Sequence, residues 1–84
     1  MIAIHYFASI REALDCDMEQ LELPEGIKTV GDLIDMLGQH HGDNWKDVLG
    51  QPNVLVAVNH EMTDLTASIK AGDEVAFLPP VTGG

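Results

Sequence analysis

Two alternating runs of apolar residues stand near the start of the chain. The run IAIHYFA is rich in β-branched and aromatic residues, and its alternation predicts a strand with Ile2, Ile4 and Tyr6 on one face. The run MEQLELP alternates again and predicts a second strand, whose apolar positions are Met18, Leu21 and Leu23. The segment SIREALDCD between them is expected to form a turn or a short helical crossing.

A helical spacing of apolar residues follows. Thr29 is a suitable N-cap, and Asp32 three residues later completes a capping-box pattern. The i, i+3, i+4, i+7 stripe of one buried helix face consists of Val30, Leu33, Ile34 and Leu37. Gly42 is the expected stop, so the pattern predicts one main helix after the first two strands.

The remaining pattern predicts more strands. VLVAV is apolar at every position, which is typical of a strand covered on both sides or of one whose outer face meets a partner. NWKDVLG suggests a short helical turn, a short strand is expected around Met62, and EVAFL is the last strand. Since the first and last strands are both apolar, a central parallel pair is expected. The fold class is therefore α+β: a β-grasp (ubiquitin-like) mixed sheet of four to five strands wrapped on one main helix.

Composition and charge narrow the function classes. The chain has 84 residues and 45% hydrophobic residues, enough for one small folded domain. Its formal charge of −10, with four basic residues, argues against a nucleic-acid partner. No apolar run has the length of a membrane span, and no signal peptide is visible, so we expect a cytoplasmic protein that does not bind membranes. One cysteine excludes an internal disulfide framework.

The final residues form an unusual tail. Pro79 and Pro80 lack a backbone N–H and end the ladder of the last strand, and the β-branched Val81 and Thr82 favour an extended backbone. We therefore divide the chain into a β-grasp domain, residues 1–78, and an extended reactive tail, residues 79–84.

Two glycines complete this tail. Gly83 and Gly84 carry no Cβ and can pass through a channel that would reject any side chain. A carboxylate is a poor electrophile and must be activated, for example as an acyl-adenylate. Because the sequence has no phosphate-binding loop or nucleotide fingerprint, we expect a second protein to activate the carboxylate of Gly84.

Several stretches resemble one known family. YFASIREA near the start, LVAVNHEMTDLTAS further on and above all GDEVAFLPPVTGG, Gly72 to Gly84, resemble the small subunit of molybdopterin synthase, the MoaD family of ubiquitin-like sulfur carriers. About half of the chain carries the resemblance. The middle, from about Asp15 to Asn53, is similar in pattern and in Trp45 only.

The resemblance implies a mechanism. An E1-like adenylating enzyme would use ATP to adenylate Gly84, and a sulfur donor would convert the adenylate into a thiocarboxylate. The molybdopterin synthase large subunit would then receive the tail, in a heterotetramer, and sulfur would pass to cyclic pyranopterin monophosphate to form the dithiolene. By the same resemblance, this chain holds no permanent cofactor, and the catalytic side chains belong to the large subunit, so this subunit donates sulfur without being catalytic itself.

Strand parity suggests a partner surface. If Val75 and Phe77 face the helix, Leu78 and Ala76 point outward, and Phe7 shares that outward parity. An apolar patch beside the tail marks an interface, and we expect Phe7, Met62 and Leu78 to dock onto the large subunit.

Other interpretations remain open. A related β-grasp sulfur carrier of the thiamine or another pathway, a ubiquitin-like protein modifier joined to lysine through Gly84, and a pure interaction domain would all fit such a sequence. Cys16 is expected to be an ordinary thiol, since Asp15 and Asp17 would raise its pKa. The four histidines are not expected to bind a metal.

Overall fold

The computed structural model describes residues 1–80. This part of the chain forms five strands and three helices. In chain order they are β1 (Ile2–Tyr6), α1 (Ala8–Leu14), β2 (Met18–Leu21), α2 (Val30–His41), α3 (Asp43–Leu49), β3 (Leu55–Val58), β4 (Glu61–Thr63) and β5 (Glu74–Leu78). The predicted tail residues Val81, Thr82, Gly83 and Gly84 lie outside the described residues.

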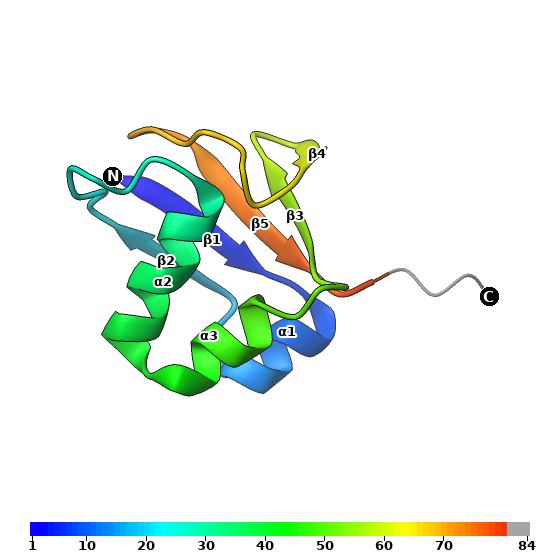
Figure 1. Ribbon diagram of the computed structural model, residues 1–84. Helices are drawn as coiled ribbons and strands as arrows, with labels where there is room; N and C mark the ends of the chain where they lie inside the picture. Colours follow the sequence, from blue (N-terminus) through cyan, green and yellow to red (C-terminus); the bar gives the residue numbers. More distant parts are fainter. Residues whose placement is uncertain (81–84) are drawn as a thin grey trace.

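All five strands form one mixed sheet. Their order is β2-β1-β5-β3-β4, with β1 and β5 parallel at the centre and every other pair antiparallel. Helix α2 crosses one face of the sheet, and α1 and α3 pack on the same side, so that no helix of residues 1–80 covers the opposite face (Figure 1). The predicted α+β β-grasp architecture and its central parallel pair are confirmed.

The structure refines two predictions about individual elements. The runs SIREALDCD and NWKDVLG are expected as turns or short helical pieces. They form most of the helices α1 and α3, so α2 is the main helix among three. Met18 does not share a face with Leu21: it pairs with His5 on the open side and is 40% exposed, whereas Leu21 pairs with the buried Ile2. Both faces of β2 carry apolar residues, so apolar positions alone could not show which one is buried.

Helix α2 begins as the sequence predicts. Asp32 N–H donates to Thr29 Oγ1 at 3.2 Å, and Thr29 N–H donates in return to Asp32 Oδ2 at 3.3 Å. This capping box satisfies backbone N–H groups at the first turn, which have no partner inside the helix. These hydrogen bonds lower the pKa of Asp32, with the Lys28 N–H bond to its carboxylate as the largest cause.

Helices α2 and α3 approach each other closely at Gly38. This glycine is buried inside α2, where a Cβ would lie 2.8 Å from Lys46 Cβ on α3. Glycine in a helix interior normally costs stability, so its presence here is explained by the space that α3 occupies. The glycine permits the short connection between the two helices.

We expect Gly38→Ala to lower the free energy of unfolding by about 1–3 kcal/mol, because the added methyl group would overpack this contact. Gly31→Ala, in the same helix, is the matched control. Its Cβ would meet nothing closer than Leu65 O at 3.4 Å, and helix propensity predicts a gain of up to about 1 kcal/mol. Urea unfolding of both variants measures the difference, and equal stabilities would show that the α2–α3 contact is not tight.

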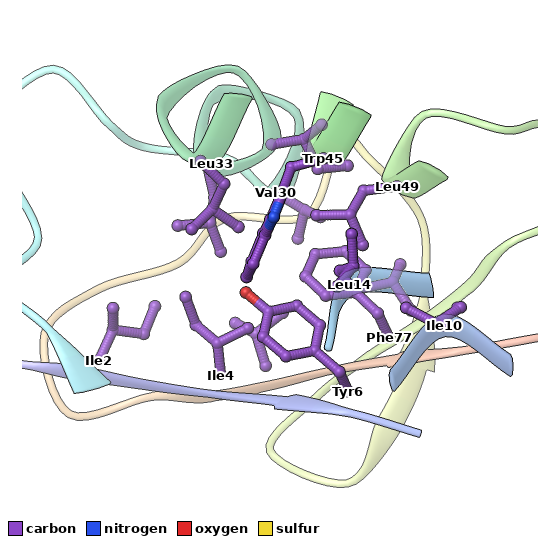
Figure 2. Packing of buried hydrophobic residues seen from close by; sticks show 14 of the residues in the cluster. Ile2, Ile4, Tyr6, Ile10, Leu14, Val30, Leu33, Trp45, Leu49 and Phe77 are labelled. Carbon is purple, nitrogen blue, oxygen red and sulfur yellow. The ribbon is translucent and has the colours of Figure 1, made fainter. Parts of the chain in front are cut away.

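The core lies between the sheet and the three helices. Ile2, Ile4 and Tyr6 of β1 are at most 1% exposed, and Figure 2 shows Ile4 and Tyr6 pointing from β1 toward Leu33 and Trp45. The predicted helix stripe completes this core from above, and β5 contributes Phe77. Burial of these side chains is the main stabilising contribution to such a small domain.

Tyr6 also belongs to a polar cluster at the edge of the core. Its ring packs edge-on against Trp45 with centroids 5.3 Å apart, and its hydroxyl donates to Glu19 Oε1 at 3.0 Å. His41 Nε2 lies 3.1 Å from both oxygens of Glu19, and its ring stacks on Trp45 at 3.7 Å. The cluster therefore ties β1, β2, α2 and α3 together.

Tyr6 is expected to make the stability of the fold fall with rising pH in the alkaline range. Burial, and secondly the charge of Glu19, raise the pKa of Tyr6 far above its usual value. An unfolded tyrosine ionises at pH ~10. The contribution of the protonated Tyr6 to the free energy of unfolding is therefore complete below that pH and is lost as the pH rises. We expect the free energy of unfolding to fall by about 1.4 kcal/mol per pH unit above pH ~10 from this residue alone.

The chain has one tyrosine and one tryptophan, so tyrosinate absorbance and tryptophan fluorescence report separately on ionisation and unfolding. Tyr6→Phe is the control and should remove this part of the alkaline slope. The raised pKa of Cys16, caused first by partial burial, makes a Cys16→Ala background advisable for both proteins. Ionisation of Tyr6 near its usual pH in the folded protein would contradict the prediction.

Candidate docking face and carrier tail

The uncovered face of the sheet holds the three predicted partner-binding residues. Phe7, Met62 and Leu78 line one depression of about 360 Å³, whose other lining residues are His5, Ala57, His60, Glu74 and Ala76. We call this the open-face depression. Its walls come from β1, β3, β4 and β5, so it exists only because the register brings these strands together.

Strand alternation places these side chains. Val75 and Phe77 of β5 are fully buried against the helices, so Ala76 and Leu78 face the opposite side. Phe7 is 43% exposed and Met62 is 60% exposed, which is high for large apolar side chains. The parity predicted for Leu78 and Phe7 is confirmed, and an exposed apolar surface of this kind is typical of an interface.

Polar groups border the depression. His60 Nε2 lies 3.3 Å from Glu74 Oε2, and the ring of His5 stacks on Phe7 with centroids 6.3 Å apart. Sequence reasoning did not select His5, His60 or Ala57 for this site, whereas strand parity predicts the outward position of Ala76. The signal that could have found them is the cross-strand register, which pairs Ala57 with both Ala76 and Met62.

Asn59 fixes the turn that carries Met62. Asn59 and His60 both have positive φ, 51° and 69°, as a tight two-residue hairpin requires. The Asn59 side chain donates to Asp73 Oδ1 and accepts from Glu74 N–H, each at 3.0 Å. The β3–β4 turn is thus bound to the start of β5, and the hairpin is held in one position beside the depression.

Pro79 and Pro80 follow the last strand next to this surface. β5 ends at Leu78, Pro79 is half-buried and Pro80 is exposed. Neither proline can continue the ladder, in agreement with the predicted end of the strand. The roles predicted for Val81, Thr82, Gly83 and Gly84 fall outside the described residues and stay predictions.

Between residues 1 and 80, the His, Cys, Asp and Glu side chains form no group of three that could hold a metal ion. Burial first, then the charge of Glu19, raises the pKa of Cys16, which keeps its thiol protonated and weakly nucleophilic. Among the described helices, none has the length and apolar character to cross a membrane.

A mixed sheet with helices on one face, an apolar surface on the other and a central parallel pair defines a ubiquitin-like β-grasp domain. Solved structures agree: small archaeal modifier protein 1 from Haloferax volcanii has a TM-score of 0.77 and 28% identity, covering 95% of this chain and 97% of that one. The chain belongs to the ThiS family, whose family model matches residues 4–84.

Two further relatives carry more specific names. The molybdopterin synthase sulfur carrier subunit of Haemophilus influenzae is 39% identical over 84 residues, covering 100% of both chains. A chain in the complex of subunits 1 and 2 of molybdopterin-converting factor from Helicobacter pylori has a TM-score of 0.66 and 25% identity, covering 99% of this chain and 97% of that one. The resemblance seen in the sequence is thereby confirmed at the level of the family.

Proposed function

We propose that this chain is the sulfur carrier subunit of a molybdopterin synthase. The observation that carries the proposal is the full-length identity of 39% with the Haemophilus influenzae subunit of that name. The ThiS-family match extends to residue 84 and so includes the Gly83–Gly84 pair. The β-grasp fold, which releases the chain from its central strand β5 beside an apolar surface, suits a carrier that presents its tail to other proteins.

The working group of the proposal is the carboxylate of Gly84. One carboxylate oxygen attacks the α-phosphate of ATP on an E1-like partner, and pyrophosphate leaves. A donor then supplies sulfur at the sulfide level. This sulfur attacks the acyl carbon, its proton goes to solvent, and AMP leaves with that oxygen, so that the net change is one oxygen replaced by one sulfur. A bare glycine carbonyl leaves both faces open to this attack.

The loaded carrier then gives its sulfur to cyclic pyranopterin monophosphate, and water supplies the oxygen that restores the carboxylate. Each dithiolene contains two sulfur atoms, so two loaded carriers are consumed for each product. In this proposal the large subunit supplies the catalytic side chains, while residues 1–78 form the presenting domain and residues 79–84 form the tail.

The open-face depression is the proposed docking surface for the large subunit. Phe7, Met62 and Leu78 offer apolar side chains, and the one carboxylate among the lining residues, Glu74, already lies beside His60. An apolar patch with few unpaired charges is the composition that interface centres favour. The same surface lies beside the exit of β5, so docking would bring the tail to the partner.

Reconstitution tests the proposal. Protein from a host that contains the activating enzyme should gain, in intact-mass analysis, the mass difference of one oxygen-to-sulfur exchange at its C-terminal residue. Mixed with a large subunit and cyclic pyranopterin monophosphate, it should form the dithiolene, whereas the uncharged carboxylate form should not. A loaded carrier that delivers no sulfur to this substrate would overturn the assignment.

One observation favours a second candidate. The similarity to small archaeal modifier protein 1 suggests a protein modifier, whose Gly84 would form an isopeptide bond with lysine. Intact-mass and peptide analysis from the same host separates the two, because a modifier produces lysine-linked conjugates. A carrier of the thiamine pathway would be loaded in the same way and would fail only in the dithiolene assay.

A further inference from the structure

The edge strand β2 has unused backbone groups. In an antiparallel ladder, successive residues bond alternately toward the partner strand and away from it. Tyr6 N–H donates to Asp17 O at 2.9 Å, which sets the phase of the β1–β2 ladder. Met18 and Gln20 therefore turn their N–H and C=O groups to the free edge of the sheet, where β2 lies in Figure 1.

Few partners meet these groups. The carbonyl of Met18 receives a weak contact from Cys16 Sγ at 3.6 Å. Within residues 1–80, no residue bonds to the N–H or C=O of Gln20. The edge can therefore accept another extended segment, which would gain main-chain hydrogen bonds there.

An apolar groove runs beside this edge. It has a volume of about 310 Å³ and is lined by Leu21, Glu22, Pro24, Met36 and His40. Leu21 points to the helix side of the sheet, since it pairs with the buried Ile2, and Met36 and His40 stand one turn apart on α2. A strand added to β2 would direct alternate side chains into this groove.

The negative charge around the β2 edge favours a basic binding partner. Residues 12–25 contain six of the fourteen acidic residues, Glu12, Asp15, Asp17, Glu19, Glu22 and Glu25. Among them, Glu22 lines the groove itself, Glu19 already contacts Tyr6 and His41, and Asp15 and Asp17 share a hollow with Arg11. Two copies of this edge would repel each other, so self-pairing is disfavoured. A basic segment would be attracted.

We propose that the β2 edge and its groove bind an extended basic segment of another protein, which adds a strand to the sheet. An apolar side chain of that segment would occupy the groove between Leu21 and Met36, and flanking lysines or arginines would face the acidic run. The other edge strand, β4, has only three residues, and the depression beside it is lined by polar groups that include Asn59, Lys70 and Asp73.

The proposed site is separate from the open-face depression, since the two share no lining residue. A segment bound at the β2 edge therefore leaves the open-face depression unfilled. This inference does not depend on the proposed function, because a protein modifier with the same edge would bind the same segment.

Amide chemical shifts provide the test. The probe is the acetylated and amidated peptide Lys-Lys-Val-Lys-Val-Lys-Lys, titrated into the full ¹⁵N-labelled chain. We expect saturable shifts at Met18–Leu21, Met36 and His40, and none at Met62 or Leu78. The same peptide with glutamates in place of lysines, or with N-methylated backbone positions facing the edge, should bind at least about tenfold more weakly.

Two variants of the chain sharpen the result. Gln20→Pro removes an outward N–H while leaving the bonds to β1, and should weaken binding about tenfold. Met36→Lys should abolish binding of the basic peptide, because it places a positive charge in the groove. The matched Met62→Lys on the open face should bind the basic peptide with the affinity of the parent chain. Peptide affinities are compared only for variants whose melting temperature is close to that of the parent chain.

The proposal is overturned by any of three results: shifts that spread over all acidic surfaces or centre on the open-face depression, unchanged affinity of Gln20→Pro, or no saturable shift with the basic peptide.

Discussion

A chain lengthened by one alanine after Gly84 is expected to lose molybdopterin synthesis by roughly a hundredfold or more. The added residue converts the carboxylate of Gly84 into an amide and moves the terminal carboxylate by up to about 3.6 Å. Misplacement of a reacting group by ~1 Å can already cost about two orders of magnitude in rate. The measurement is dithiolene formation in the reconstituted system, with thiocarboxylate formation followed by mass.

An alanine added before Met1 is the matched control. Met1 is 61% exposed, so this extension changes the length of the chain equally and leaves its other end free. Its activity should equal that of the parent chain. Normal dithiolene formation by the version extended after Gly84 would disprove the idea that the carboxylate of this residue is the reacting group.

Leu78→Asp is expected to weaken binding to the large subunit by about 2–4 kcal/mol, which corresponds to a loss of roughly thirtyfold to a thousandfold in affinity. Leu78 lines the open-face depression and lies at the end of β5, where the proposed interface meets the tail. A carboxylate there would lose its water on docking without gaining a partner. Isothermal titration calorimetry with the large subunit gives the affinity.

Leu65→Asp is the matched control, because Leu65 is 48% exposed and lies beside α2, away from the depression. Leu65→Asp should bind the large subunit with the same affinity as the parent chain. Met62→Asp provides a second test on the proposed surface at a side chain that is 60% exposed, where the fold is least disturbed. If both variants on the open face keep their fold and their affinity, the large subunit docks elsewhere.

Local patterns were enough to predict the main elements. The alternation of Ile2, Ile4 and Tyr6 and the capping box at Thr29 appear in the structure as the sequence indicates, because each depends on residues close in the chain. The β-grasp arrangement followed from the order of these elements and from two apolar strands at the beginning and the end. Parity along β5 then placed Leu78 on the open face.

Features made by distant residues could not be predicted in this way. Gly38 looks like a weak point of a helix until α3 is known to pack against it through Lys46. Glu19 looks like a surface residue of a strand, but the end of α2 brings His41 to within 3.1 Å of its carboxylate. The histidines around the open-face depression likewise become neighbours of Phe7 and Met62 only through the strand register.

The pairing of β1 with β5 joins residues 3–6 to residues 74–77 at the middle of the sheet. Contacts between such distant parts of a chain close late in folding, because the entropy of a long loop must be overcome first. During translation, the centre of this sheet therefore cannot assemble before β5 has been synthesised. A nascent or prematurely terminated chain without β5 would lack the buried Val75 and Phe77 and the side chains of Ala76 and Leu78 that line the open-face depression, so we expect it neither to fold stably nor to offer this surface to a partner.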